Sequence, residues 1–304
     1  RGAGSSPCRL LIEFRLARSP PSMSGMPELI PPLMQDMGRP LVREGARELM
    51  SGFNIWQPAP QAQDSLFQIV GSDFSQVLEI HLRPSEVVTA EPRSMLFASD
   101  GVSLGADMGG LGQGCKRCCC AGESMFRLHL QHDGRNPNSV EKVALTPAFP
   151  AKVVPVDLRQ YDGLIFNRGA FLAALGRDWH VDVKMVRSLG TACCAGQGLF
   201  MNTLHGDGMV FLNAGGTVMT KQLAPGEKIV VDKHGLLAFE RAVTISIRSS
   251  GGCMVCCCAA QGLFNTELTG PGLVWVHTMS LGKLRQAVGA AAGGGGGGNQ
   301  GGGS

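Results

Sequence analysis

Short hydrophobic runs separated by turn residues follow one another along the chain from residue 65 to about residue 280. The first three, at 66–70, 77–82 and 87–90, are rich in β-branched and other β-favouring residues and are divided by Gly, Ser-Asp and Pro-Ser. Similar runs follow at 153–158, 163–166, 181–186, 209–212, 229–231, 243–247 and 273–276. Turn signals recur at intervals of about 8–12 residues, and no stretch sustains the period of about 3.6 residues that marks a helix. The pattern predicts an all-β sandwich or barrel.

One block of sequence occurs three times. The block from Cys119 to Phe126 (Cys-Cys-Ala-Gly-Glu-Ser-Met-Phe) is echoed at 193–200 and again at 257–264. A leucine lies four residues after the final phenylalanine of each block, which gives the pairs Phe126 and Leu130, Phe200 and Leu204, and Phe264 and Leu268. Such self-similarity indicates one structural unit built several times. We therefore expect the three phenylalanines and the three leucines to be buried in equivalent places.

A second repeated element supports the same division. Residues 82–88 (Leu-Arg-Pro-Ser-Glu-Val-Val) resemble residues 223–229 (Leu-Ala-Pro-Gly-Glu-Lys-Ile), and each reads as a strand end, a proline-led turn and a new strand. In the middle of the chain, residues 158–165 take the same place without the Pro-x-Glu sequence. The predicted β domain spans 65–282, with units at about 65–138, 139–214 and 215–282. Residues 1–64 are expected to form a mostly irregular N-terminal extension and residues 283–304 a flexible glycine-rich tail.

Composition and charge narrow the classes of function. The chain is 44% hydrophobic and 17% charged, with a net charge of +3, three Trp and one Tyr. Its basic residues are scattered, so nucleic-acid binding is not expected. No apolar stretch reaches the roughly 18 residues of a transmembrane helix, which leaves peripheral association with a membrane open.

The first 26 residues have a composition of their own. They carry four arginines and several serines against a single acid, Glu13. This is the composition of an organellar transit peptide, and it predicts a mitochondrial location. In the alternative interpretation the start lies at Met23 or Met26 and the protein is cytoplasmic.

Ordered segments along most of the chain resemble one known family. They are residues 82–86 and 90–92, 116–117 and 122–126, 169–173, 198–200, 225–227 and 231–232, 238–240, and 270–272. Together they resemble the altered inheritance of mitochondria protein 24 family. The resemblance implies three tandem units with a tryptophan RNA-binding attenuator protein-like fold, each like a small double-stranded β-helix, arranged about a pseudo-threefold axis. It implies no catalytic residues, and in fungal members a link to the organisation of the mitochondrial inner membrane.

Motifs for catalysis are incomplete in this sequence. Residues 109–116 approach a phosphate-binding loop, but Cys115 stands where a lysine is required. There is no His-x-His, the signature of a metal-binding cupin. We therefore predict no enzymatic activity. The expected function is that of a scaffold or interaction protein that binds a protein partner and supports mitochondrial membrane organisation.

The cysteines are the remaining candidates for chemistry. Eleven occur, ten of them in or just before the repeated blocks. Two Cys-x-x-Cys pairs, Cys115 with Cys118 and Cys253 with Cys256, occupy equivalent places in the first and third units and could supply four thiolates to Zn²⁺. The alternatives are that the cysteines act as small packing residues, which we favour, or carry lipid.

For the function of the protein as a whole, RNA binding by analogy of fold is a further alternative.

Overall fold

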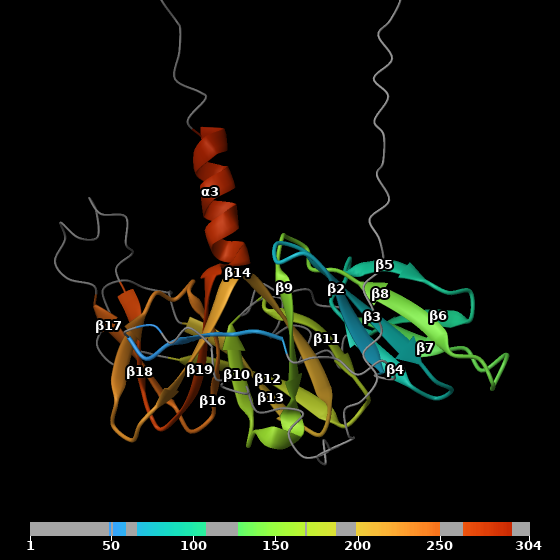
Figure 1. Ribbon diagram of the computed structural model, residues 1–304, viewed down its shortest axis with the longest axis horizontal. Coiled ribbons are helices and arrows are strands. Elements are labelled where there is room, and N and C mark those ends of the chain that lie inside the picture. The colour runs from blue at the N-terminus through green and yellow to red at the C-terminus, as the bar shows by residue number, and fades with distance from the viewer. Residues whose placement is uncertain are drawn as a thin grey trace, which may run out of the picture. The chain divides into compact units, whose positions relative to one another are not determined.

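The computed structural model describes residues 49, 51–58, 66–107, 127–167, 169–186, 199–249 and 264–293 (Figure 1). Almost all of the regular secondary structure in these residues is antiparallel β-sheet, so the predicted all-β fold is confirmed. The strands are β1 (Asn54–Ile55), β2 (Phe67–Gly71), β3 (Gln76–Leu82), β4 (Val87–Ala90), β5 (Met95–Ala98), β6 (Val102–Asp107), β7 (Arg127–His132), β8 (Glu141–Leu145), β9 (Lys152–Asp157), β10 (Leu164–Asn167), β11 (Phe171–Leu175), β12 (Trp179–Val186), β13 (Leu199–Gly206), β14 (Met209–Leu223), β15 (Lys228–Val231), β16 (Leu236–Glu240), β17 (Thr244–Ser249), β18 (Phe264–Thr269) and β19 (Gly272–Met279).

The strand pairings follow the same order three times. In the first repeat, β8 lies between β3 and β5, and β7 lies between β4 and β6. In the second, β14 lies between β9 and β11, and β13 lies between β10 and β12. In the third, β19 lies between β14 and β16, and β18 lies between β15 and β17. We call these sets of strands the first, second and third repeat. The pseudo-threefold axis and the unit boundaries stay predictions; β8 lies after residue 138, where the first unit was expected to end.

Strand β14 belongs to two repeats. Its first part, residues 209–214, pairs with β9 and β11, and its second part, residues 218–223, pairs with β19. The pairing shifts by a bulge between Gly215 and Val218. A Cβ atom on Gly215 would lie 2.4 Å from the carbonyl oxygen of Met279. Only glycine fits this close approach of two backbones, which explains the Gly-Gly pair in the middle of a long strand.

The three cysteine blocks lead from one strand of a hairpin to the next in each repeat. The hairpins are β6–β7, β12–β13 and β17–β18, and the second strand of each carries the predicted leucine. Leu130, Leu204 and Leu268 are all fully buried, as predicted. Phe126 lies outside the described residues. Phe200 and Phe264 lie in β13 and β18, but their side chains are not part of the description.

The two Pro-x-Glu turns have the same hydrogen bonds. The backbone N–H of Arg83 donates to the Glu86 carboxylate at 2.7 Å, and that of Ala224 donates to the Glu227 carboxylate at 2.9 Å. Each glutamate folds back on the residue three positions before it, so the turn directs the chain from one strand to the next. The residue before the glutamate has a positive φ in both turns, 70° at Ser85 and 79° at Gly226.

Consecutive repeats are joined by strand pairing. Strand β11 of the second repeat pairs with β4 of the first, and β16 of the third pairs with β10 of the second. Across the first junction, the guanidinium of Arg127 lies 4.2 Å from the centre of the Phe171 ring. Both β11 and β16 carry a bulge, and the bulged residue is a leucine each time, Leu172 and Leu237. Each leucine is buried in the hydrophobic core of the preceding repeat.

One element was not expected from the sequence. Helix α3 (Leu281–Gly293) follows β19 and covers the first part of the segment expected to be a flexible tail. The Ser280 hydroxyl caps it by accepting a hydrogen bond from the Lys283 N–H at 3.1 Å. The rest of that segment, 294–304, and most of the N-terminal extension lie outside the described residues.

Candidate functional site

The predicted zinc ligands lie outside the described part of the chain. Cys115 and Cys118 fall in the segment between β6 and β7, and Cys253 and Cys256 fall between β17 and β18. Among the residues that the structure does describe, no group of three or more His, Cys, Asp and Glu side chains comes close enough to hold a metal ion. The zinc site therefore stays a prediction.

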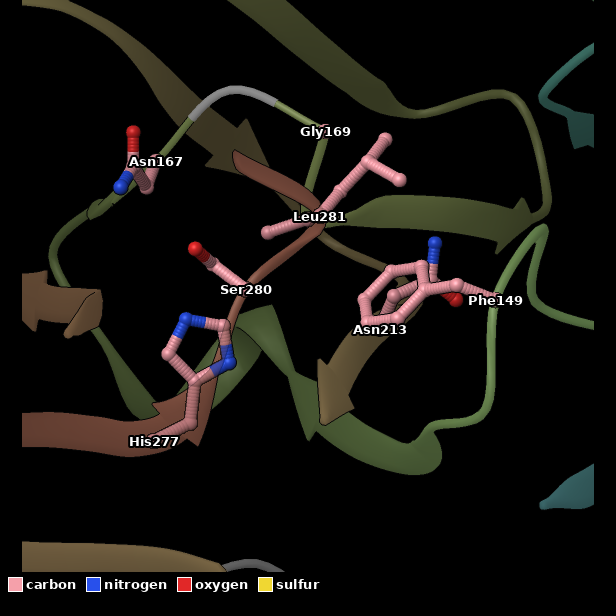
Figure 2. A pocket seen from close by; sticks show the side chains of 8 residues that line it. Phe149, Asn167, Gly169, Asn213, His277, Ser280 and Leu281 are labelled. Carbon is pink, nitrogen blue, oxygen red and sulfur yellow. The ribbon is translucent and has the colours of Figure 1, made fainter. Parts of the chain in front are cut away.

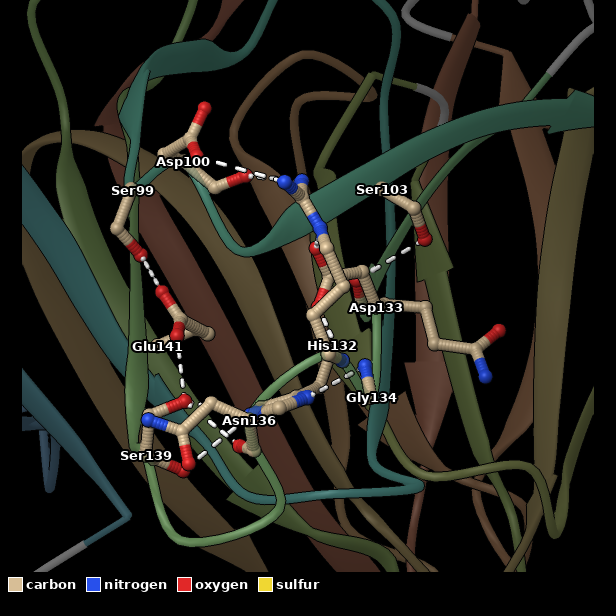
Figure 3. Close-up of polar contacts among 11 residues, drawn as sticks. Ser99, Asp100, Ser103, His132, Asp133, Gly134, Asn136, Ser139 and Glu141 are labelled. Carbon is tan, nitrogen blue, oxygen red and sulfur yellow. Dashed lines mark hydrogen bonds and ion pairs between the residues drawn. The ribbon is translucent and has the colours of Figure 1, made fainter.

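A polar network in the first repeat links the segment after β5 to the segment between β7 and β8 (Figure 3). The Glu141 carboxylate accepts hydrogen bonds from the hydroxyls of Ser99 and Ser139, and His132 Nε2 lies 3.2 Å from the Ser139 hydroxyl. The bonds from Ser99 and then Ser139 lower the pKa of Glu141. Beside it, Arg135 pairs with Asp133. Each carboxylate oxygen of Glu141 accepts a hydrogen bond from one serine hydroxyl, so the network joins the loops that carry Ser99 and Ser139.

A small pocket lies where the second and third repeats meet (Figure 2). Its polar lining includes Asn167, Asn213, His277 and Ser280. Asn213 and His277 occupy the same place in their repeats: the N–H of Asn213 donates to the carbonyl of Ala170, and the N–H of His277 donates to that of Gly235. The pocket has room for about one water molecule, so it is too small for an organic substrate.

His277 is buried at this junction. Only 6% of the residue is exposed, and burial, with a smaller contribution from Lys283, lowers its pKa to about 4. The imidazole is therefore neutral near pH 7. A neutral histidine in a pocket of this size fits a packing role at the junction.

Strand β5 carries three consecutive exposed apolar residues. Met95, Leu96 and Phe97 follow one another and are 38%, 57% and 47% exposed. The strand pairs with β8 on one side, and on its other side the described residues provide no strand. Strand β15 is similar: it pairs with β18 alone among the described strands, and its Val230 is 47% exposed. Such sheet edges can pair with a strand from another chain.

The sequence analysis missed the strand at β5. Residues 95–98 were not among the predicted runs, although a signal was present. Met-Leu-Phe-Ala at 95–98 has the same apolar character as Phe-Leu-Ala-Ala at 171–174 and Leu-Leu-Ala-Phe at 236–239, and all three contain leucine in second place. The segments at 171–174 and 236–239 were not among the predicted runs either, so this resemblance was the available signal that the three are equivalent strands.

No helix in the described residues combines the length and the apolar character needed to span a membrane. This agrees with the sequence, in which no apolar stretch of that length occurs.

Comparison with known proteins identifies the family. A search of curated proteins found no match. Among solved structures, the chain is similar to the crystal structure of protein SPYM3_0169 from Streptococcus pyogenes, with 26% sequence identity and a TM-score of 0.57, over 74% of this chain and 98% of that one. The profile of the family described as mitochondrial biogenesis AIM24 matches residues 67–279, from β2 to the end of β19. The chain therefore belongs to the mitochondrial biogenesis AIM24 family.

Proposed function

We propose that this protein is a non-enzymatic scaffold that binds a protein partner through the edges of its sheets and supports mitochondrial membrane organisation from the membrane surface. The observation that carries the proposal is the exposed run of Met95, Leu96 and Phe97 on β5. A strand edge offers backbone donors and acceptors to a partner, and the three large side chains add apolar surface for it to cover. Family membership supports the mitochondrial setting.

The free energy of covering apolar surface favours an interface at β5 over exposure of its three large side chains to water. Most of the large apolar side chains of the described strands are buried, whereas these three share one short strand. Covering apolar surface contributes about 25 cal/mol per Å², so the three side chains together can contribute several kcal/mol to binding. An edge of this kind left uncovered is a site of aggregation. A partner strand on β5 removes both the exposed surface and the unpaired backbone groups.

The test is the size of the native complex in cells. The full-length protein, tagged at its C-terminus, is expressed as wild type and as Leu96→Asp, and mitochondrial extracts are compared on native gels. We expect the wild type in the mitochondrial fraction, in a complex larger than the free chain, and Leu96→Asp at a smaller size. Phe74→Ser is the matched control, because Phe74 is 80% exposed but lies in the turn between β2 and β3.

Two results would contradict the proposal. If Leu96→Asp runs in the same complex as the wild type, β5 is not the binding edge. If the wild type runs at the size of the free chain, or is missing from the mitochondrial fraction, the scaffold function in mitochondria is wrong.

A further inference from the structure

We propose that the pocket where the second and third repeats meet is a binding site for one water molecule, held between the His277 ring and the Ser280 hydroxyl (Figure 2). Ser280 lies between the end of β19 and the start of α3, so the water joins the last strand to the helix. The site shares no residue with the β5 edge and goes beyond the proposed function, so each can fail without the other.

Two polar side chains at this pocket are almost fully buried. His277 is 6% exposed and Ser280 is 8% exposed. Among the described residues, no atom forms a hydrogen bond of ordinary geometry with either ring nitrogen of His277. The backbone of His234 favours the protonated ring without completing such a bond. Because buried polar atoms nearly always have a partner, from the protein or from ordered water, the His277 ring calls for one.

The second repeat shows how the same position is satisfied by a direct contact. Asn213, the counterpart of His277, donates from its side-chain nitrogen to the carbonyl of Phe171 at 3.2 Å. Phe171 and Leu236 are the residues just before the bulges of β11 and β16, so the counterpart carbonyl in the third repeat is that of Leu236. That carbonyl accepts a hydrogen bond from the Asn167 side chain at 3.0 Å. The direct solution of the second repeat is therefore already taken in the third.

The pocket suits a single water molecule in size and polarity. It has room for about one water molecule, which is the least space that a buried water needs. Cavities that stay dry are lined by apolar groups alone, whereas this lining combines polar side chains with Phe149 and Leu281. In the described part of the chain no cluster of His, Cys, Asp and Glu could hold a metal ion, so a metal is not the expected occupant.

The arrangement of the side chains places the water at one end of the pocket. Figure 2 shows the Ser280 side chain next to the His277 ring, whereas Asn213 lies beside Phe149 on the other side. The water is therefore assigned to His277 and Ser280, and Asn213 is not one of its partners.

The hydrogen-bond roles of His277 and Ser280 complement those of water. The Ser280 oxygen accepts a hydrogen bond from the Lys283 N–H at 3.1 Å, so its hydroxyl proton can be donated. Burial lowers the pKa of His277 to about 4, so near pH 7 the ring is neutral and one of its nitrogens is an acceptor. A water that accepts from Ser280 and donates to His277 satisfies both groups.

The water extends the cap of α3 into the junction between the repeats. Ser280 holds the first turn of the helix, because its hydroxyl accepts from the Lys283 N–H and its carbonyl accepts from the Leu284 N–H. Leu281, the first residue of the helix, lines the same pocket. Through the water, the start of α3 is tied to His277 and so to the place where the second and third repeats meet.

The direct test is a high-resolution crystal structure of the full chain near pH 7. We expect one solvent peak about 2.7–3.2 Å from both the Ser280 hydroxyl oxygen and a ring nitrogen of His277. A pocket without solvent density overturns the proposal. A His277 ring that bonds the Ser280 hydroxyl directly overturns it as well.

Nuclear magnetic resonance tests the same site in solution. In the chain labelled with nitrogen-15 histidine, we expect a single neutral tautomer of His277 at pH 7 and cross-relaxation between its ring protons and a slowly exchanging water. His132 is the matched control, because it is 3% exposed but has protein partners at both nitrogens: Nδ1 accepts from the Gly134 N–H at 3.0 Å, and Nε2 lies 3.2 Å from the Ser139 hydroxyl. Equal water signals at the two rings, or a signal at neither, would count against the site.

A variant removes the site and counts the water. His277→Phe keeps a ring of similar size without polar atoms, so it should lower the number of long-lived waters by one in oxygen-17 relaxation dispersion. His81→Phe changes a histidine outside the pocket and should leave that number unchanged. The same number in His277→Phe and the wild type would overturn the proposal. Amide spectra show whether each variant is folded, and the crystal structure of the wild type decides if His277→Phe does not fold.

Discussion

Strands β11 and β5 hold the same place in consecutive repeats and differ in what lies beside them. Both pair with the last strand of their own repeat, and both have a bulge at a leucine. Leu172 of β11 is buried because it packs into the hydrophobic core of the first repeat, whereas Leu96 of β5 is exposed. This difference shows that a short strand in this fold is buried where a strand of another repeat lies beside it. A repeat at the end of the series therefore presents as surface what an internal repeat buries.

The largest effect expected from this comparison is on stability. Leu237→Ala removes a fully buried side chain from the core of the second repeat and should lower the free energy of unfolding by about 3 kcal/mol. Leu96→Ala at the counterpart position should change it by less than about 0.5 kcal/mol in dilute solution, where the exposed side chain contacts water. Urea denaturation monitored by tryptophan fluorescence measures both values. Equal losses for the two variants would show that the strands are not in different environments.

The pH dependence of stability tests a second pair of counterparts, Asn213 and His277. The pKa of His277 is about 4 in the folded chain and about 6.5 when exposed. Between these values the unfolded chain binds a proton that the folded chain does not, so stability falls as the pH falls from about 6.5 to about 4. The loss attributable to His277 should approach about 3 kcal/mol at the acid end.

His277→Asn provides the control for that dependence, since asparagine is the residue at the counterpart position. The variant should lose part of the pH dependence between about pH 6.5 and about pH 4, while the carboxylates, which titrate in both proteins, leave the remainder. Urea denaturation at several pH values measures the slopes. Parallel slopes for wild type and variant would refute a buried, neutral His277.

Substitutions in the two Pro-x-Glu turns should change the stability by smaller amounts and with opposite signs. Ser85 and Gly226 both have φ values between 70° and 79°, a region that costs a residue with a Cβ atom about 1 kcal/mol. Ser85→Gly should therefore stabilise the first repeat by up to about 1 kcal/mol, and Gly226→Ser should destabilise the third by a similar amount. No atom lies within 4 Å of a Cβ built on Gly226, so backbone strain alone is measured there. Thermal denaturation of both variants gives the signs, and a shared sign would contradict the equivalence of the turns.

The cysteine blocks carry the smallest expected effect. If the cysteines are packing residues, replacing Cys193 and Cys194 together with alanine should change the free energy of unfolding by less than about 0.5 kcal/mol. The first and third blocks differ from the second in their Cys-x-x-Cys pairs. Elemental analysis decides between packing and zinc there: stoichiometric zinc that is lost in the Cys115→Ser, Cys118→Ser variant, with a lower melting temperature that a chelator reproduces, would replace the packing interpretation with a metal site.

The sequence by itself determined the class of fold and several positions within it. The spacing of hydrophobic runs and turn residues gave the all-β prediction, and the repeated blocks pointed to Leu130, Leu204 and Leu268 as core residues. The two Pro-x-Glu turns were also predicted from the sequence. These features depend on local preferences, namely alternation along a strand and the conformations open to a turn, so a single sequence is enough to expose them.

Only the tertiary structure decided which strands lie at an edge and which are covered. The segments at 95–98, 171–174 and 236–239 are alike in sequence, yet the first is exposed and the other two are buried. The pKa of His277 likewise depends on burial, and the pocket that His277 lines includes residues more than a hundred positions away, such as Asn167 and Phe149. Strand pairing and burial are fixed by contacts between segments distant in the sequence, and the local pattern of a segment contains no information about which partner it meets.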